Sequence, residues 1–213
     1  MILSDMYKEF SLYGFDDLTD SQKLLLLNES YFDIVTREPW PFLESLVTLT
    51  VPAATSKVTN NSFSGSPTDV NSVLSLVDVT NNIVVVPERT DVVQKNYFLD
   101  KAVAFPDRYY FVGDDLYLYP ATSASTKYNL FYTRIPTEAI TTSDTFMIPS
   151  RHHSVIIYGA LVKAYLVNDD PQAAMFQNMF ESRYQQMRND VWMNQYDRTD
   201  RIHVLTDSYD WNY

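Results

Sequence analysis

Residues 1–43 carry apolar side chains at intervals of three or four residues, which is the spacing of one helix face. These positions are Leu24, Leu27, Tyr31, Ile34 and Val35. Thr19 followed by Gln22 is a capping-box pattern, so this helix is predicted to begin at Thr19 and to end before Pro39. A shorter helix is predicted from about Asp5 to Leu12, where Gly14 ends it.

Between Glu44 and Arg134 the pattern changes to short runs rich in β-branched and aromatic residues, which indicates strands. Arg108–Val112 and Leu116–Tyr119 are predicted to form a hairpin in which Gly113 supplies the positive φ of the turn. Lys127–Thr133 alternates two sets of side chains and ends this region. Strands this closely spaced suggest a small sandwich or barrel inserted between helices.

Two further helices are predicted after the strands. Ser150 is the expected cap of the first, and Val155–Leu166 is apolar on nearly every side, so it is expected to be buried within a domain or between subunits. Asp170 and Pro171 are typical of the start of the second. Its apolar stripe is Phe176, Phe180, Tyr184, Met187 and Val191, and the periodicity stops after Trp192.

The sequence therefore predicts an α+β protein with three parts. Residues 1–43 and 136–194 form a helical bundle of an N-terminal helix and a C-terminal antiparallel pair, and residues 44–135 form the inserted antiparallel β domain. Residues 195–213 form an extended tail whose large side chains either dock on another chain or fold back on their own domain. The polar segment 52–72 is either a solvated hairpin tip or an arm that reaches a neighbouring subunit.

Composition narrows the possible functions. The 16 basic residues are scattered among 27 acidic ones, for a formal net charge of −11, which argues against tight binding of nucleic acid through phosphates. Without cysteine, neither disulfides nor thiolate metal sites can form. No secretory signal and no apolar run long enough for a bilayer is visible, so a protein made in a cytoplasm, without membrane contact, is expected.

The residue types that carry catalysis do not form a recognisable set. The adjacent His152 and His153 would diverge by about 100° on a helix and cannot easily hold one metal, so capping or packing is expected for them. The Asp pairs lie at turns and helix starts, where Asp caps the backbone. Nothing singles out two carboxylates for a glycosidase, and four scattered glycines cannot build a phosphate loop. No catalytic residue, cofactor or metal is therefore expected.

Several segments resemble, in order and spacing, the head–tail adaptor (connector) proteins of tailed bacteriophages over about residues 18–192. They are Leu27–Tyr31, Asp33–Arg37, Trp40–Leu43, Phe105–Tyr110, Leu116–Pro120, Tyr128–Tyr132, Ile135–Pro136, Ser143–Asp144, Ile148–Pro149, His152–His153 and Tyr158–Ala160. The polar loop and the aromatic tail depart from the family pattern.

The resemblance implies a virion protein of the neck, assembled in the cytoplasm of the host bacterium. Such adaptors form a ring of twelve copies that binds the portal, extends the DNA channel and offers a platform to the next tail or nozzle protein. Genomic DNA would pass without sequence-specific binding. The expected subunit-interface residues are Val155, Tyr158, Leu161 and Tyr165. The expected portal-docking residues are Tyr196, Ile202, Val204, Leu205, Tyr209 and Trp211.

Two alternatives come from other classes of protein. Exposed Tyr and Trp side chains that stack on sugar would suit a carbohydrate- or receptor-binding module of a tail fibre, although the helical ends argue against a repetitive, β-rich fibre. A hydrolase of cell-wall glycan would use two of the acidic residues. A ring of about twelve copies on the portal favours the adaptor over both, whereas a trimer or lytic activity would favour an alternative.

Overall fold

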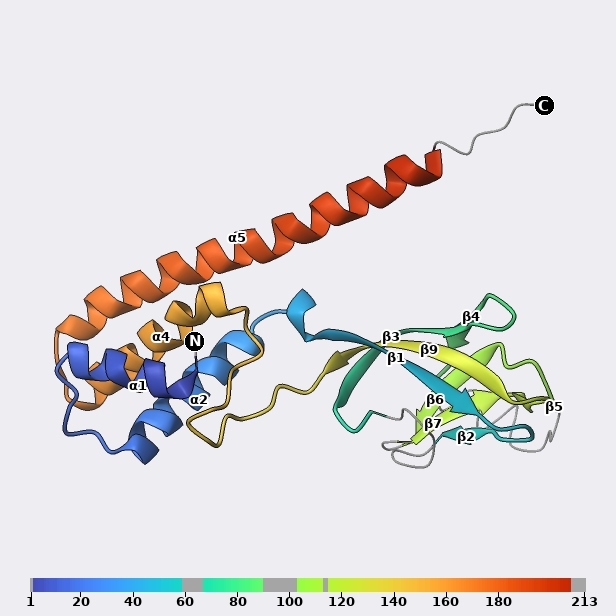
Figure 1. Cartoon of the computed structure of the whole chain (residues 1–213), viewed down its shortest axis with the longest axis horizontal. Helices are drawn as coiled ribbons and strands as arrows, with labels where there is room; N and C mark the ends of the chain where they lie inside the picture. Colours follow the sequence, from blue (N-terminus) through green and yellow to red (C-terminus); the bar gives the residue numbers. More distant parts are fainter. Residues whose placement is uncertain (1, 59–66, 90–102, 113–114, 208–213) are drawn as a thin grey trace. The chain divides into compact units, whose positions relative to one another are not determined.

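The computed structural model describes residues 2–58, 67–89, 103–112 and 115–207 (Figure 1). The chain divides into two compact units, one of residues 1–43 with 136–213 and one of residues 44–135. We refer to them as the helical unit and the β unit. The α+β class predicted from the sequence is confirmed.

The helical unit combines segments from both ends of the sequence. Its elements are α1 (Leu3–Leu12), α2 (Asp20–Val35), the 3₁₀ turn η1 (Pro41–Leu43), the 3₁₀ turn η2 (Ser150–His152), α4 (His153–Val167) and α5 (Gln172–Asp207). Helix α4 packs against both α2 and α5 (Figure 1). Because α4 is apolar on nearly every side, most of its residues are buried by these neighbours.

Local signals set the boundaries of α1 and α2. The Thr19 side chain accepts a hydrogen bond from the backbone N–H of Gln22, and the Gln22 side chain accepts one from the backbone N–H of Thr19, so the predicted capping box is confirmed. Helix α1 ends before Gly14, whose φ of 85° is a backbone conformation that favours glycine.

The two C-terminal helices begin differently. The predicted Ser150 cap of α4 is wrong, because Ser150 lies in η2 and α4 begins after His152 without a side-chain cap. The 3₁₀ turn instead uses the backbone, since the His152 N–H donates to the Pro149 carbonyl at 2.8 Å. For α5 the prediction is confirmed, because Asp170 Oδ1 accepts from the Gln172 N–H at 2.8 Å.

Helix α5 is longer than predicted. The expected extended tail of residues 195–213 is wrong for residues 195–207, which continue the helix to Asp207. No glycine or proline occurs between Gln172 and Asp207, so no residue in this stretch breaks the helical backbone. Residues 208–213, with the predicted docking residues Tyr209 and Trp211, lie outside the described residues.

The β unit is built around a curled mixed sheet of seven described strands in the order β1-β9-β3-β4-β6-β7-β2. Its strands are β1 (Glu44–Val51), β2 (Lys57–Val58), β3 (Val70–Asp78), β4 (Ile83–Pro87), β6 (Arg108–Val112), β7 (Asp115–Tyr119) and β9 (Thr126–Arg134). Strands β5 (Val103–Ala104) and β8 (Ala121–Thr122) form a separate, parallel two-stranded sheet.

The predicted hairpin is confirmed as the antiparallel pair β6 and β7, although its Gly113 lies outside the described residues. Strands β4 and β6 are parallel and the other pairings of the large sheet are antiparallel. Residues 57–58 of the polar segment form β2, and residues 59–66 are outside the described part. Whether that segment is a hairpin tip or an arm stays a prediction.

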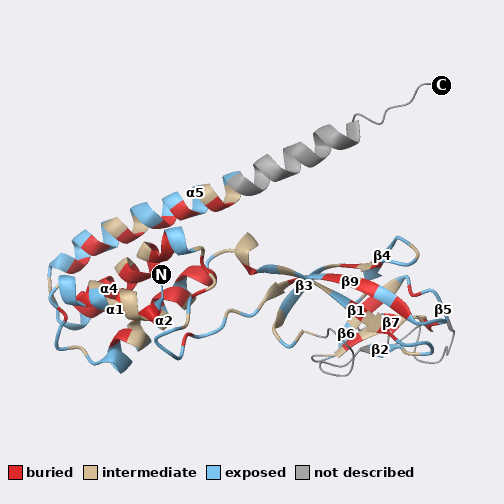
Figure 2. Cartoon of the chain, viewed as in Figure 1, coloured by how far each residue is buried: buried red, intermediate tan, exposed pale blue. Residues whose placement is uncertain are grey.

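Each unit has its own apolar core (Figure 2). In the helical unit the predicted stripe of α5 is buried, from Phe176 to Val191. In the β unit β9 alternates, with Tyr128, Leu130 and Tyr132 buried and Phe131 exposed. The periodicity in the sequence therefore identified the buried face of α5 correctly, and the alternation expected for residues 127–133 is confirmed in β9.

Candidate functional site

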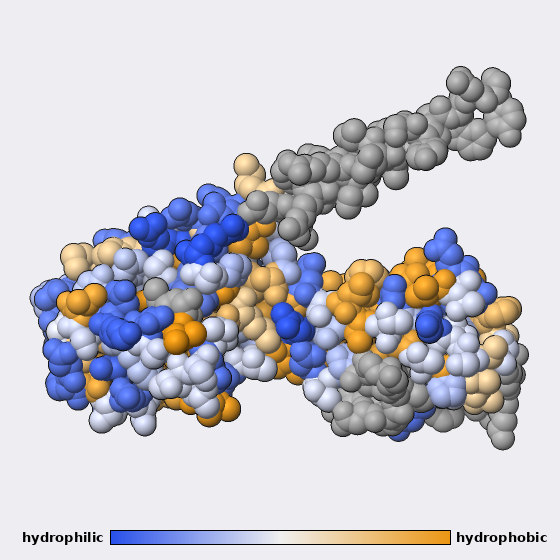
Figure 3. Space-filling view, in the orientation of Figure 1, coloured by the Kyte–Doolittle hydropathy of each residue, from blue (hydrophilic) through white to orange (hydrophobic). Residues whose placement is uncertain are grey.

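The β unit exposes apolar side chains on the outer face of its sheet (Figure 3). Leu46 of β1 lies opposite Phe131 of β9, and their exposed fractions are 53% and 38%. Val84 of β4, which lies opposite Val77 of β3, is 60% exposed. Polar pairs interrupt the face, since Thr48 Oγ1 donates to Asn129 Oδ1 at 2.8 Å. A face of this kind suits contact with protein more than catalysis.

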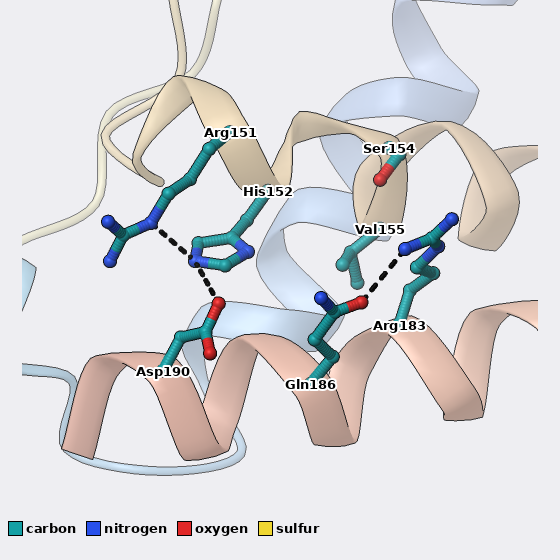
Figure 4. Close-up of a pocket in the computed structure, with 7 residues that line it drawn as sticks. All are labelled: Arg151, His152, Ser154, Val155, Arg183, Gln186 and Asp190. Atoms are coloured by element: carbon teal, nitrogen blue, oxygen red, sulfur yellow. Dashed lines mark hydrogen bonds and ion pairs between the residues drawn. The ribbon is translucent and has the colours of Figure 1, made fainter. Parts of the chain in front are cut away.

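The helical unit has a cavity of about 220 Å³ where η2 and the start of α4 face the middle of α5 (Figure 4). Its lining residues are Arg151, His152, Ser154, Val155, Arg183, Gln186 and Asp190. A second cavity of about 350 Å³ is lined by Tyr158, Asn178, Met179, Ser182 and Arg183. Because Arg183 lines both, the two cavities adjoin along the same pair of helices, and we call them together the α4–α5 groove.

The most buried polar group of the groove is His152. Its Nε2 accepts a hydrogen bond from Arg151 Nε at 2.9 Å, and Asp190 Oδ2 lies 3.7 Å from the same nitrogen (Figure 4). Burial and the charge of Arg151 lower the pKa of His152, against the opposing effect of Asp190. The short contact with an Arg donor requires an unprotonated nitrogen, so the neutral imidazole is the form that fits this geometry.

His153 has a different environment from its neighbour. It is buried, and its Nε2 lies 2.7 Å from the Ile148 carbonyl. The two imidazoles therefore serve packing and hydrogen bonding at different places, as the helical spacing predicts. Among the described residues no group of three or more His, Cys, Asp or Glu side chains is arranged to hold a metal ion.

The residues predicted to lie between subunits have unequal exposure. Val155, Leu161 and Tyr165 are buried in the core of the helical unit. Tyr165 stacks on Phe176 with 4.9 Å between ring centroids, so its ring already has a partner within the chain. Tyr158 is partly exposed and lines the α4–α5 groove. A role in a subunit contact stays a prediction for all four residues, of which Val155 and Tyr158 line the α4–α5 groove.

The predicted portal-docking residues fall on the continuation of α5. Tyr196, Ile202, Val204 and Leu205 belong to the helical segment that ends at Asp207. Among the α5 side chains that the structure describes, which end at Met193, the last buried one is Val191, and the predicted docking residues follow this part of the helix in the sequence. Their docking stays a prediction, now for a helical segment instead of an extended one.

Glu38, which the sequence patterns did not single out, ties the end of α2 to α5. Its carboxylate accepts hydrogen bonds from Tyr184 Oη at 3.2 Å and from Trp192 Nε1 at 3.3 Å, and it pairs with Arg188 Nε at 2.9 Å. Burial and the charge of Glu38 raise the pKa of Tyr184, which keeps its hydroxyl protonated as a donor. We call this set the Glu38 clamp.

The neighbouring residues extend the Glu38 clamp. The Arg37 guanidinium lies 4.9 Å from the centroid of the Tyr184 ring and pairs with Glu181 at 3.5 Å. Trp40 meets Tyr184 edge to face with 5.8 Å between centroids, and its Nε1 donates to the Ile34 carbonyl at 2.9 Å. The clamp therefore holds α5 just before Gln195, where the segment predicted to dock begins.

A sequence family described as SU10 adaptor protein matches residues 1–204 of the chain. No curated protein sequence matches the chain significantly. Within the described residues, no helix combines the length and the apolar character needed to cross a membrane.

Proposed function

Because the chain belongs to the SU10 adaptor protein family, a family of phage head–tail adaptors, we propose that it forms a closed ring between portal and tail. In this proposal about twelve copies, the number that the resemblance implies, extend the DNA channel below the portal and present a platform to the next tail or nozzle protein. The match over residues 1–204 carries the proposal. The protein acts mechanically in it, without a catalytic step.

The charge of the chain supports a role around passing DNA. With a formal net charge of −11, the chain as a whole repels phosphates and has no basic run that would grip them. A channel wall must let the genome slide, so weak attraction favours ejection. Binding of the genome in this proposal is therefore neither tight nor sequence-specific.

The two compact units suggest that each makes different contacts in the neck. We assign ring formation to a helical domain of residues 1–43 and 136–194, and further contacts in the neck to a β domain of residues 44–135. The exposed apolar face of the β unit, with Leu46, Val84 and Phe131, supports a protein-contacting role for that domain.

We assign portal docking to the continuation of α5. Tyr196, Ile202, Val204 and Leu205 supply the apolar side chains, with Tyr209 and Trp211 after the helix. A segment that is already helical loses less conformational entropy on binding than an extended one. The Glu38 clamp supports this assignment because it holds α5 firmly just before the docking segment.

The test compares the full chain with a chain that lacks Gln195–Tyr213. Portal rings are mixed with each protein, and bound protein is measured by co-sedimentation and by electron microscopy of the particles. We expect the truncated chain to lose attachment while its circular dichroism and unfolding transition show a folded helical unit. Normal attachment of the truncated chain would refute the docking assignment.

A matched pair of variants separates side-chain contacts from mere length. One variant replaces Tyr196, Ile202, Val204 and Leu205 with serine, and its control replaces the polar Gln195, Thr199 and Thr206 with serine. We expect loss of attachment in the first only. If the portal particles carrying the unmodified protein show no ring of about twelve copies, the proposed ring is refuted.

A further inference from the structure

The outer face of α2 exposes apolar side chains that the helical unit does not cover. Leu25 is 58% exposed, because it lies about 160° around the helix from the buried Leu27. Ile140 is 75% exposed, and Asn28, one turn after Leu25, holds it nearby. Asn28 Nδ2 donates to the Ala139 carbonyl at 2.9 Å, and the Ala139 N–H donates to Asn28 Oδ1 at 3.1 Å. We call Leu25 and Ile140 the α2 patch.

The α4–α5 groove is apolar at the end near the start of α5. Tyr158 and Met179 are partly exposed there, and Met175, one turn earlier on α5, is 50% exposed. Methionine side chains are flexible and polarisable, so they adapt to the shape of a partner. Arg183 lies one turn after Met179 and lines the groove with it. The groove thus offers an apolar surface followed by a cation.

The α2 patch and the groove lie on different sides of the helical unit, since α2 and α5 pack on different sides of α4 (Figure 1). Ile156 of α4 faces α2, because its carbonyl accepts a hydrogen bond from Ser30 Oγ at 2.8 Å. Tyr158 lies about 160° around α4 from Ile156 and lines the groove. Because α2 meets α4 with its inner face, Leu25 on its outer face points away from both α4 and the groove.

We propose that the α2 patch of one copy packs into the apolar end of the α4–α5 groove of the next copy. The inference rests on the proposed ring and deepens it, because it names the two surfaces that meet. Leu25 and Ile140 cover Tyr158, Met175 and Met179 in this contact, and burial of these apolar side chains stabilises it. Two different surfaces on separate sides of one unit produce a head-to-tail contact, and repetition of that contact closes a ring.

The direction of the helices fits this contact. Within one copy α2 and α5 run the same way, since Ser30 and Phe180 both lie against Gly159 and the later Glu38 binds the later Trp192. In a ring whose axis runs along these helices, the rotation from one copy to the next keeps their direction. Helix α2 of the next copy therefore lies parallel to α5 when it meets the groove.

Charge also fits a second copy as the occupant. Glu29 lies one turn after Leu25, as Arg183 lies one turn after the apolar end of the groove, so parallel helices bring this carboxylate and this guanidinium together. Glu29 and Asp33 share the single cation Lys163, at 3.3 and 2.7 Å, so two carboxylates face one ammonium and this side of α2 has a negative balance. Such a pair at the rim sets the register of the contact more than its affinity.

Cross-linking between single-cysteine chains tests the contact, since the chain contains no cysteine. Full-length Leu25→Cys and Ser182→Cys proteins, the second altered in the groove lining, are mixed with portal rings and treated with a short thiol-specific cross-linker. We expect several-fold more covalent dimer from the mixture than from either protein alone. A chain with both substitutions is expected to give a ladder of higher multimers, because each copy then carries one cysteine for each neighbour.

The control mixture pairs Ser182→Cys with Lys8→Cys, whose side chain is 77% exposed but lies on α1. Dimer yields no higher than in this control, or equal dimer from either variant alone, would overturn the inference, as would portal protein seated in the groove in electron-microscopy reconstructions. The same images separate the two proposals. Rings on portals without the cross-link remove only the contact, whereas the cross-link without portal binding supports the contact and removes the portal function.

Discussion

Glu38 shows how a single carboxylate holds together segments that lie far apart in the sequence. We expect Glu38→Ala to lower the free energy of unfolding by about 2 kcal/mol, because it leaves Tyr184, Arg188 and Trp192 without their acceptor. Urea denaturation measures the change. The control is Glu181→Ala, which removes an exposed ion pair and should cost less than about 1 kcal/mol. Equal losses in the two variants would contradict a structural role for Glu38.

His152 should make stability depend on pH. Its pKa in the folded protein is below the ordinary 6.5, so the unfolded chain binds the proton more readily. The stabilising contribution of the neutral form is complete above pH 6.5 and decreases as the pH falls below it. We expect His152→Gln to flatten this part of the profile of melting temperature against pH. An unchanged slope in the variant would assign the dependence to other groups.

Asp144 should act in a separate, more acidic range. Hydrogen bonds from the backbone of Thr141 and Ile140 hold the pKa of Asp144 below its usual 3.8. Its contribution is therefore present above pH 3.8 and is lost as the pH falls through the lower folded pKa. Asp144→Asn should change the melting temperature near neutral pH and lose that difference in strong acid. A difference that persists in strong acid would be evidence against this account.

For single residues, the sequence predicted the separate roles of His152 and His153, because adjacent side chains on a helix point in different directions. It could not predict the Glu38 clamp, since Glu38 lies at an ordinary helix end. Its partners Tyr184 and Trp192 are 146 and 154 positions away in the chain. Proximity of this kind is produced by tertiary packing and leaves no local pattern.

The crossing of α2, α4 and α5 depends on Gly159. A Cβ at this position would overlap Ser30 Oγ and press on the Phe180 ring. We expect Gly159→Ala to destabilise the protein by about 1–3 kcal/mol, although alanine favours the helix by about 1 kcal/mol. Thermal unfolding measures the effect.

The matched control for this crossing is a double-mutant cycle with Ser30→Ala, which removes the overlapping oxygen. The double variant should be more stable than the sum of the two single changes implies. Additive losses would mean that the overlap with Ser30 does not limit the approach of the helices.

Element by element, the apolar period was a good guide to buried faces and a poor guide to helix length. The stripe from Phe176 to Val191 was found because those side chains pack on the core. The continuation to Asp207 was missed because periodicity reports burial, whereas helix formation needs only a backbone without breakers. The parallel pairing of β4 with β6 has no signal in either strand, because it depends on long-range topology.

For the whole molecule, the β unit has the geometry of an insertion. Glu44 at the start of β1 pairs with Thr133 near the end of β9, so the chain enters and leaves the unit side by side. We expect a protein without residues 44–135, in which a short Gly/Ser linker joins Leu43 to Pro136, to keep a cooperatively folded helical unit. Circular dichroism during heating measures this. A broad, non-cooperative transition would contradict two independently folding domains.

The division of the helical unit between both ends of the sequence has a consequence for biosynthesis. Helices α1 and α2 leave the ribosome first, but α4 and α5, which cover them, follow only after the whole β unit has been made. At usual translation speeds this delay is on the order of 10 s. The β unit can therefore complete its fold during synthesis, while the helical unit, with the α4–α5 groove, forms later, after α4 and α5 have been translated.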